Sequence, residues 1–146
     1  TQTFGIGVEY NDSRVFAEFA RCVIENRNII LKTKGETKRS YLNVQDAVEA
    51  IIKIMTSDVA NEVFNVANEN TYCSIYEMAI LVANKIAKGN ISVELDIEEE
   101  NSMGFAPTLK MNLDTSKLCK LGWSARTSLE DTFNEMILWM REHKNG

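Results

Sequence analysis

The chain has 146 residues, and its 21 acidic and 16 basic side chains give a formal net charge of -5. With 45% hydrophobic and 25% charged residues it has the composition of an ordinary globular protein, long enough for one domain with a buried core. An acidic pI of about 5.0 argues against nucleic acid as a partner, because binding phosphates requires many cations. No apolar run reaches the roughly 20 residues of a membrane-spanning helix, so no membrane partner is expected.

The first third of the chain is predicted to form a strand, a helix and a second strand. Residues 1–4 have the pattern of a strand end, which a glycine turn at 5–7 closes. Asp12 or Ser13 is expected to cap a helix, and a short buried strand follows at 29–31. The apolar residues of this helix recur at helical spacing and predict one buried face. They are Val15, Phe16, Phe19, Ala20, Val23 and Ile24.

A basic cluster comes next, and on an acidic chain it indicates a local anionic ligand. For its lysines a solvated turn is the better interpretation. Arg39 stands beside the strand residues Tyr41 and Leu42, and there a ligand contact and a solvated turn are equally supported by the pattern. The cluster consists of Lys32, Lys34, Lys38 and Arg39, with Glu36 among them.

The middle of the chain is predicted to contain a helix over residues 44–56, a strand over 62–66 and a turn carrying several asparagines. Asn43 is expected to cap the helix, and Asp46 in its first turn suits the helix dipole. The predicted core face of this helix consists of Val44, Val48, Ile51, Ile52 and Met55. The predicted turn carries Asn65, Asn68, Asn70 and Tyr72.

The last part of the chain contains three further predicted helices and two strands. Ser74 and Glu77 have the spacing of a capping box for a helix that ends near Gly89. Short strands are expected at 91–95 and 109–113, separated by an acidic loop. Asp114 or Thr115 is expected to open a short helix that ends at Gly122. Ser128 with Asp131 is predicted to cap the final helix, whose core face is Leu129, Phe133, Met136, Ile137 and Met140.

Residue types that carry catalysis are sparse. The single histidine, His143, lies almost at the chain end, which argues against Ser/His/Asp and Cys/His sites. The cysteines are odd in number and widely spaced, which argues against a zinc site and a disulfide framework and indicates a cytoplasmic protein with reduced thiols. No tyrosine has a lysine four positions on, so the residues alone describe a binding module without a reaction centre. The cysteines are Cys22, Cys73 and Cys119.

Five short motifs nevertheless occur in one characteristic order across nearly the whole chain. Together they resemble the C-terminal, substrate-binding part of the extended short-chain dehydrogenases, the NAD-dependent nucleotide-sugar epimerases and dehydratases. The motifs are Gln2-Thr3-Phe4-Gly5-Ile6-Gly7, then Arg39-Ser40-Tyr41-Leu42-Asn43-Val44-Gln45-Asp46 after Gly35, Phe64-Asn65-Val66-Ala67, Ser74-Ile75-Tyr76-Glu77-Met78-Ala79, and Asp114-Thr115-Ser116-Lys117-Leu118 with Leu121-Gly122-Trp123.

This resemblance implies a small α/β domain of short strands and about five helices, a single substrate-binding lobe over residues 1–146. In the family, an N-terminal Rossmann domain holds NAD(P) and a catalytic Tyr-x-x-x-Lys. That domain is therefore expected in a longer parent protein, from which this chain looks cut out, since it starts at Thr1 rather than at a methionine. No catalytic and no cofactor-binding residue is expected in this chain, and alone it should be inactive and bind no cofactor.

The resemblance also assigns residues to a nucleoside-diphosphate sugar. Arg39 and Gln2 are implied to bind the diphosphate, while Ile30 and Lys32 lie where relatives pack the nucleotide base. Val15 and Phe16 correspond to a helix start that lines the pocket. Two departures are visible: Ile6 replaces a family proline, and residues 103–106 contain no cation where many relatives have a second phosphate-binding arginine.

Two alternatives stay open at this level. The chain could be a non-enzymatic binding or interaction domain that keeps the same fold, or part of a reductase of keto-sugar nucleotides. An isolated lobe is further expected to self-associate, because separation from a Rossmann domain would expose apolar surface.

Overall fold

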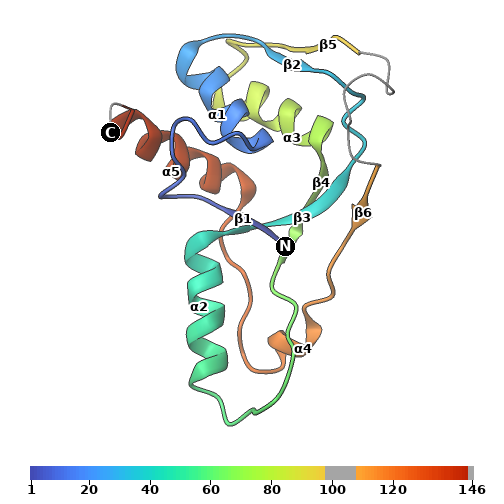
Figure 1. Ribbon diagram of the computed structural model, residues 1–146, viewed down its shortest axis with the longest axis vertical. Coiled ribbons are helices and arrows are strands. Elements are labelled where there is room, and N and C mark those ends of the chain that lie inside the picture. The colour runs from blue at the N-terminus through green and yellow to red at the C-terminus, as the bar shows by residue number, and fades with distance from the viewer. Residues whose placement is uncertain (98–107, 145–146) are drawn as a thin grey trace.

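The computed structural model describes residues 1–97 and 108–144 and has a mixed α/β fold, which confirms the predicted fold class (Figure 1). Its larger sheet is built around the strand β3, to which β1 and β6 pair in parallel and β4 pairs antiparallel. The strands β2 and β5 form a separate parallel pair. The strand bounds are β1 (Gln2–Phe4), β2 (Ile29–Leu31), β3 (Lys38–Asn43), β4 (Asn68–Ser74), β5 (Val93–Leu95) and β6 (Lys110–Met111).

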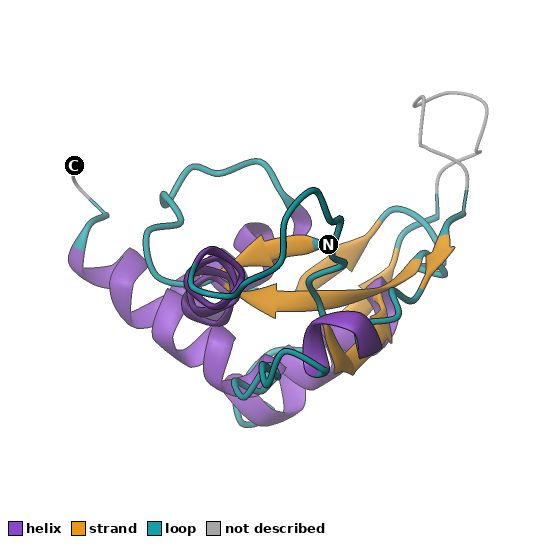
Figure 2. Ribbon diagram, turned by 90° about the horizontal axis from the view of Figure 1, so that it is seen from below, coloured by secondary structure: helices purple, strands orange, loops and turns teal. Residues whose placement is uncertain are grey.

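Within the described residues, five α-helices lie against these strands. In Figure 1, α1, α3 and α5 lie on one side of β1 and β3, and α2 and α4 lie on the other. Figure 2 shows the strands side by side, with α5 running out toward the C terminus. The helix bounds are α1 (Val15–Glu25), α2 (Val44–Met55), α3 (Ile75–Leu81), α4 (Ser116–Cys119) and α5 (Leu129–Glu142), and α3 continues into the π-helical turn η1 (Val82–Ile86).

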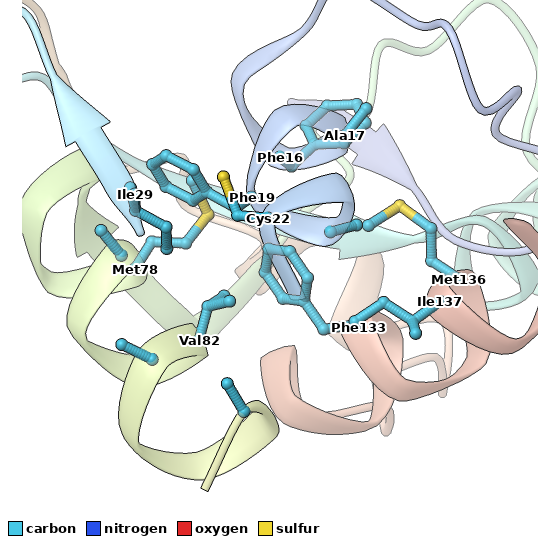
Figure 3. Packing of buried hydrophobic residues seen from close by; sticks show 14 of the residues in the cluster. Phe16, Ala17, Phe19, Cys22, Ile29, Met78, Val82, Phe133, Met136 and Ile137 are labelled. Atoms are coloured by element: carbon cyan, nitrogen blue, oxygen red, sulfur yellow. The ribbon is translucent and has the colours of Figure 1, made fainter. Parts of the chain in front are cut away.

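The larger apolar cluster fills the space between β1, α1, α3 and α5, as Figure 3 shows. The Phe4 ring of β1 stacks on Phe16 of α1 with a centroid distance of 4.3 Å, and Phe133 of α5 meets Phe4 edge-on at 5.3 Å. Phe16 and Phe133 are fully buried. The predicted core positions of α5 are confirmed, and Cys22 packs among them as a small apolar side chain.

The smaller cluster lies under α2 and α4 on the other side of β3. It consists of Leu42, Ala50, Leu118 and Trp123, with Ala47 and Ile54 packed at its margin. The Trp123 indole N–H is fully enclosed and has no hydrogen-bond acceptor within the described residues.

The predicted core face of α2 is wrong at four of its five positions, and the fifth, Val44, is half-buried. Val48, Ile51, Ile52 and Met55 are between 49% and 78% exposed. The helix is buried instead through Asp46 and Ala50. The physical reason is that the small side chains of Ala47 and Ala50 allow α2 to pack against β3, while most of its large apolar residues are exposed. Alanines carry little weight in an apolar pattern, so the pattern selected the wrong side.

Several predicted helix starts are confirmed at atomic level. Ser74 and Glu77 form the reciprocal capping box of α3, and the Ser128 hydroxyl accepts a bond from Asp131 N–H at 3.0 Å. The Asn43 side chain accepts a hydrogen bond from the backbone N–H of Gln45 in the first turn of α2. The prediction that Asp12 or Ser13 caps α1 is wrong. Asp12 accepts from the backbone and side chain of Arg14 instead, and α1 begins after Arg14 without a side-chain cap.

The predicted strand at 62–66 is also wrong, because no strand forms there and β4 begins only at Asn68. Val63 is 83% exposed. The predicted turn region instead pairs with β3, and the register between the two strands shifts after Arg39. At this shift the Thr71 hydroxyl accepts from Tyr41 N–H at 2.8 Å, which replaces a regular ladder bond. Such a side-chain substitution leaves no trace in apolar periodicity.

Two further predictions hold with shorter elements than expected. Within 91–95 only β5 forms, and within 109–113 only β6 forms. In the part of the chain that the structure describes, no helix combines the length and apolar character needed to cross a membrane.

Candidate functional site

Arg39 is the centre of the candidate site. It lies near the start of β3, opposite Cys73 of β4 on one side and Met111 of β6 on the other. Its side chain is half-buried, and within residues 1–97 and 108–144 its guanidinium has no hydrogen bond and no ion pair. A guanidinium presents five donors in a planar fork, which suits carboxylate or phosphate oxygens. Arg39 is therefore a cation available to an anionic ligand.

The structure brings Gln2 and Arg39 to the same face of the sheet. Residues two apart on a strand share a face, so Arg39 and Tyr41 lie on one side of β3. Gln2 stands opposite Tyr41 in the parallel register of β1 and β3. Gln2 and Arg39 therefore lie on the same face of the sheet as Tyr41, although their sequence positions differ by 37.

Two titratable neighbours of Arg39, Tyr41 on the same strand and Cys73 on β4, stay uncharged near neutral pH. Burial raises the pKa of Tyr41 to about 12, with the positive charge of Arg39 acting in the opposite direction. Burial likewise raises the pKa of the Cys73 thiol to about 11. Neither neighbour therefore supplies a negative charge that would neutralise the guanidinium.

Val15 and Phe16 occupy the start of α1 beside β1. The Phe16 ring is fully buried against Phe4, and the Arg14 guanidinium carbon lies 4.7 Å from its centroid on the outside. Val15 is half-buried against the larger cluster. Packing explains both side chains in this structure, and their contact with a ligand stays a prediction.

Ile30 and Lys32 belong to a different part of the molecule. Ile30 is the middle residue of β2 and is 54% exposed, so the predicted buried strand is buried only at its ends. The Lys32 ammonium pairs with the Asp96 carboxylate at 2.5 Å. No strand pairing joins β2 to β3 in the described residues, so the structure does not bring these two residues together with Arg39 through a shared sheet.

Gly35 holds the basic segment against α3. Its φ of +65° is in the left-handed region, and a Cβ atom would lie 2.8 Å from the Tyr76 backbone nitrogen. The carbonyls of Gly35 and Thr37 accept from Tyr76 N–H at 3.1 Å and from Ile75 N–H at 3.0 Å. These bonds satisfy the first amides of α3, so this helix start is closed to an anion.

Among the described residues, hollows of about 380 and 480 Å³ lie at the surface, and neither of these is lined by Arg39 or Gln2. The first lies beside the glycine turn after β1. The second is lined by Lys34, Lys38 and Lys110, together with Glu36 and Glu77. Lys38 pairs with Glu77 at 3.1 Å, so part of this positive charge is neutralised within the fold. Lys110 could not be added to the cluster from sequence, because the pairing of β6 with β3 brings it there.

The glycine turn after β1 does not form a dinucleotide-binding loop. The glycines of the turn after β1 have positive φ, yet α1 begins only at Val15, too far along to place its first amides at that turn. Among the described residues, no group of three or more His, Cys, Asp or Glu side chains could hold a metal ion. The segment 103–106, whose sequence contains no cation, and most of the acidic loop lie outside the described residues.

Comparison with known proteins gives a match between residues 1–67 and the model of the NAD dependent epimerase/dehydratase family. Over 140 residues the chain is 26% identical to UDP-glucuronic acid decarboxylase 1 of Xenopus tropicalis, a match that covers 96% of the chain and 32% of that protein. It is 27% identical over 132 residues to the UDP-N-acetyl-alpha-D-glucosaminuronate decarboxylase of Bacillus cytotoxicus, covering 90% of the chain and 41% of that protein. The chain thus spans about a third to two-fifths of these relatives.

Solved structures share the fold over almost the whole chain. The UDP-glucose 4-epimerase of Thermotoga maritima, determined with UDP-glucose, matches with a TM-score of 0.78 at 22% identity, over 99% of this chain and 45% of that one. The UDP-glucuronic acid 4-epimerase of Bacillus cereus, in complex with UDP-glucuronic acid and NAD, matches with a TM-score of 0.75 at 15% identity, over 97% of this chain and 43% of that one.

Proposed function

We propose that this chain is the nucleotide-sugar-binding part of an NAD-dependent enzyme of the epimerase/dehydratase family. The match of residues 1–67 to the family model and the similarity to UDP-sugar decarboxylases support this proposal. The observation that carries it is the half-buried Arg39 guanidinium, which lacks an anionic partner in the described residues and lies on the same sheet face as Gln2.

In this proposal Arg39 binds the diphosphate of a nucleoside-diphosphate sugar. Its two parallel N–H groups reach two phosphate oxygens, and charge-assisted hydrogen bonds of this kind contribute about 1.5–3 kcal/mol each. The Gln2 amide donates to the same diphosphate from the neighbouring strand. Tyr41 on the same face stays neutral and adds no repulsion.

The remaining ligand contacts are assigned more peripherally. Ile30 offers an exposed apolar surface for a nucleotide base, and Lys32 directly follows the same strand. Val15 and Phe16 form the wall next to β1. These assignments rest on the family resemblance.

The reaction centre is proposed to lie in an N-terminal Rossmann domain of the same cytoplasmic protein. That domain contributes the Tyr-x-x-x-Lys pair and binds NAD(P), which supplies reversible hydride transfer at C4 of the sugar. Residues 1–146 alone bind no cofactor and are inactive. Their part in the reaction is to hold the diphosphate so that the sugar reaches the other domain.

The test is a calorimetric titration of the whole polypeptide with UDP. Arg39→Ala is expected to weaken binding about tenfold, on the order of 1.4 kcal/mol. The affinity of Arg39→Lys should lie between those of the unmodified protein and Arg39→Ala, because lysine keeps the positive charge but lacks the planar pair of N–H donors. Arg141→Ala, an exposed cation on α5, is the matched control and should bind as the unmodified protein does. Equal affinity for UDP in the Arg39→Ala protein would overturn the assignment.

The reaction type is read out separately by incubating the polypeptide with UDP-glucose or UDP-glucuronic acid. A product of unchanged mass indicates epimerisation, loss of water indicates dehydration, and loss of carbon dioxide indicates decarboxylation. Consumption of NAD(P)H with a keto-sugar nucleotide would identify the reductase alternative. Binding of UDP with no turnover in any of these assays would favour the non-enzymatic alternative.

A further inference from the structure

Three lysine side chains converge on the surface hollow of about 480 Å³. Lys34 comes from the loop before β3, Lys38 from β3 itself and Lys110 from β6. Lys38 and Lys110 stand directly opposite each other in the parallel register of the two strands. This lysine hollow brings together cations from three segments, in a chain whose formal net charge is -5.

The arrangement of these cations is unfavourable without a ligand, because like charges directly opposite each other on neighbouring strands destabilise a sheet. Lys38 is compensated by the Glu77 carboxylate at 3.1 Å and packs over the Tyr72 ring, 5.1 Å from its centroid. Within the described residues, Lys34 and Lys110 have no ion pair. Conflicts of this kind are expected at functional sites, where a bound group resolves them.

Two carboxylates also line the lysine hollow, but they do not cancel its charge. The Glu77 carboxylate accepts from Ser74 N–H at 2.7 Å in the capping box of α3, and its charge is matched by Lys38. Glu36 forms no ion pair with Lys34 or Lys110 in the part of the chain that the structure describes. The described lining therefore keeps one positive charge in excess.

Ser74 and Tyr76 add hydroxyl groups to the same hollow. The Ser74 hydroxyl accepts from Glu77 N–H at 3.0 Å, and its own hydrogen can still be donated. The Tyr76 side chain is 41% exposed, so its ring is available for packing. Ammonium and hydroxyl donors suit phosphate oxygens, and the neighbouring aromatic ring suits an organic group attached to the phosphate.

The lysine hollow is separate from the Arg39 site. Successive residues of a strand point to opposite faces, so Lys38 and Arg39 lie on opposite sides of β3. Ser74 of β4 and Lys110 of β6 both stand opposite Lys38 in the strand register, and they share its face of the sheet. Two anions can therefore bind near the start of β3 without sharing a cation.

We propose that the lysine hollow is a second anion site, which binds the phosphate group of a phosphate monoester. Such a group carries about 1.5–2 negative charges near pH 7, which suits the two ammonium groups of Lys34 and Lys110. Ser74 donates to a phosphate oxygen, and the organic part of the ester packs on Tyr76. This site goes beyond the proposed function and does not depend on it.

The test is a calorimetric titration of the whole polypeptide carrying Arg39→Ala, which removes the other anion site, with inorganic phosphate and with phenyl phosphate. Adding Lys34→Gln or Lys110→Gln is expected to weaken binding of both probes about fivefold or more. Adding Lys85→Gln, an exposed lysine outside the lining of the hollow, is the matched control and should leave binding unchanged.

Three results of this titration would overturn the proposal. The first is that neither probe binds to the Arg39→Ala protein. The second is equal affinity with and without Lys110→Gln. The third is an equal loss of affinity with Lys85→Gln, which would show that the probes respond only to the overall charge of the protein.

The two probes also distinguish an ester from free phosphate. Phenyl phosphate is expected to bind about threefold tighter than inorganic phosphate, because its ring packs on Tyr76, and Tyr76→Ala should remove this difference. Equal affinity of the unmodified hollow for both probes would identify inorganic phosphate as the ligand and contradict the assignment of an ester.

Thermal unfolding in phosphate-free buffer tests the charge conflict independently. Lys110→Gln removes one of two opposing ammonium groups, so its midpoint should equal or exceed that of the unmodified protein. Added phosphate should raise the midpoint of the unmodified protein more than that of the variant. A lower midpoint of Lys110→Gln without phosphate would show that carboxylates of the protein already neutralise this lysine, and the proposed site would then be refuted.

Discussion

The two sides of the central sheet differ in how completely their apolar side chains are covered. Between β1, α1, α3 and α5, aromatic and aliphatic residues form one closed cluster with fully buried members such as Phe16, Phe133 and Met136. On the α2 side a small cluster is followed by an outer layer of isoleucines and a methionine that face solvent. On the first side the large apolar residues are covered by this chain, whereas on the second several of them remain exposed to solvent.

The difference is also visible between two single helices. α5 carries its large apolar residues on the side facing the sheet and leaves Leu138 exposed among polar neighbours. α2 has large apolar residues on the side that faces away. An amphipathic pattern therefore shows that an apolar face exists, and only the packing shows whether this chain or another covers it.

Phe133→Ala should produce the largest effect, because the ring is fully buried and contacts Phe4 edge-on. Truncating a buried phenylalanine costs about 3–5 kcal/mol of unfolding free energy. Urea denaturation measures this loss. Leu138→Ala on the same helix is the control and should change stability by less than about 0.5 kcal/mol. Similar losses for both variants would break the contrast between the closed and the exposed positions.

Gly35→Ala comes next, because it strains the connection that holds α3 in the closed side. The left-handed φ and the contact of the new Cβ with the Tyr76 nitrogen predict a loss of roughly 1–3 kcal/mol. Gly89→Ala shares the left-handed φ but meets open space, so it measures the backbone cost without the clash. Thermal unfolding of both variants compares them. Equal losses would mean that the approach to Tyr76 is not tight.

The capping box predicts a smaller, pH-dependent effect. The backbone hydrogen bond from Ser74 and the neighbouring Lys38 lower the pKa of Glu77 below its usual 4.5. Its stabilising contribution is thus present above the unfolded pKa and is lost as the pH falls through the lower folded value. Because the Glu77 side chain is 53% exposed, solvent screening keeps the contribution of its charge to the free energy of unfolding below about 1 kcal/mol.

Glu77→Gln tests this directly. The variant should be less stable than the unmodified chain at about pH 7, and the difference should shrink at about pH 3. Urea midpoints at the two pH values provide the measurement. A difference that is the same at both would show that the charge of Glu77 does not contribute.

Ile52→Ser should have the smallest effect on the stability of residues 1–146. Its side chain is 55% exposed, so the free energy of unfolding is expected to change by less than about 0.5 kcal/mol. Sedimentation of the same variant should show weaker self-association than the unmodified chain, because one exposed apolar residue of α2 is removed. A loss above about 1 kcal/mol would show that this side of α2 is already packed within this chain.

Sequence patterns predicted the elements whose signals are local. Ser74 with Glu77 and Ser128 with Asp131 each place a hydroxyl three residues before its partner, and both caps are confirmed. Sequence patterns could not predict β4, because its pairing depends on β3 and on a hydrogen bond between the Thr71 hydroxyl and Tyr41, some thirty positions away. They also could not distinguish the two apolar sides of α2, since the choice depends on what covers each.

In the candidate site, too, some features could be predicted from the sequence and others depend on contacts between distant residues. The resemblance pointed to Arg39 and Gln2, and strand pairing brings them to one face of the sheet. The absence of an anionic partner for the guanidinium in the described residues needed coordinates, because any acidic side chain in the chain could have approached it. The grouping of Lys110 with Lys34 likewise depends on β6 lying beside β3.

The two tryptophans give this molecule a spectroscopic reporter. Trp123 is buried in the cluster beneath α2, while Trp139 stacks on His143 near the C terminus with a centroid distance of 3.7 Å. Replacing Trp139 with phenylalanine leaves a single indole emitter under the helix that is open to solvent on its other side. Mixing experiments that follow the wavelength and lifetime of its fluorescence would then record the arrival of any partner on α2 as a rate, in real time and without an attached dye.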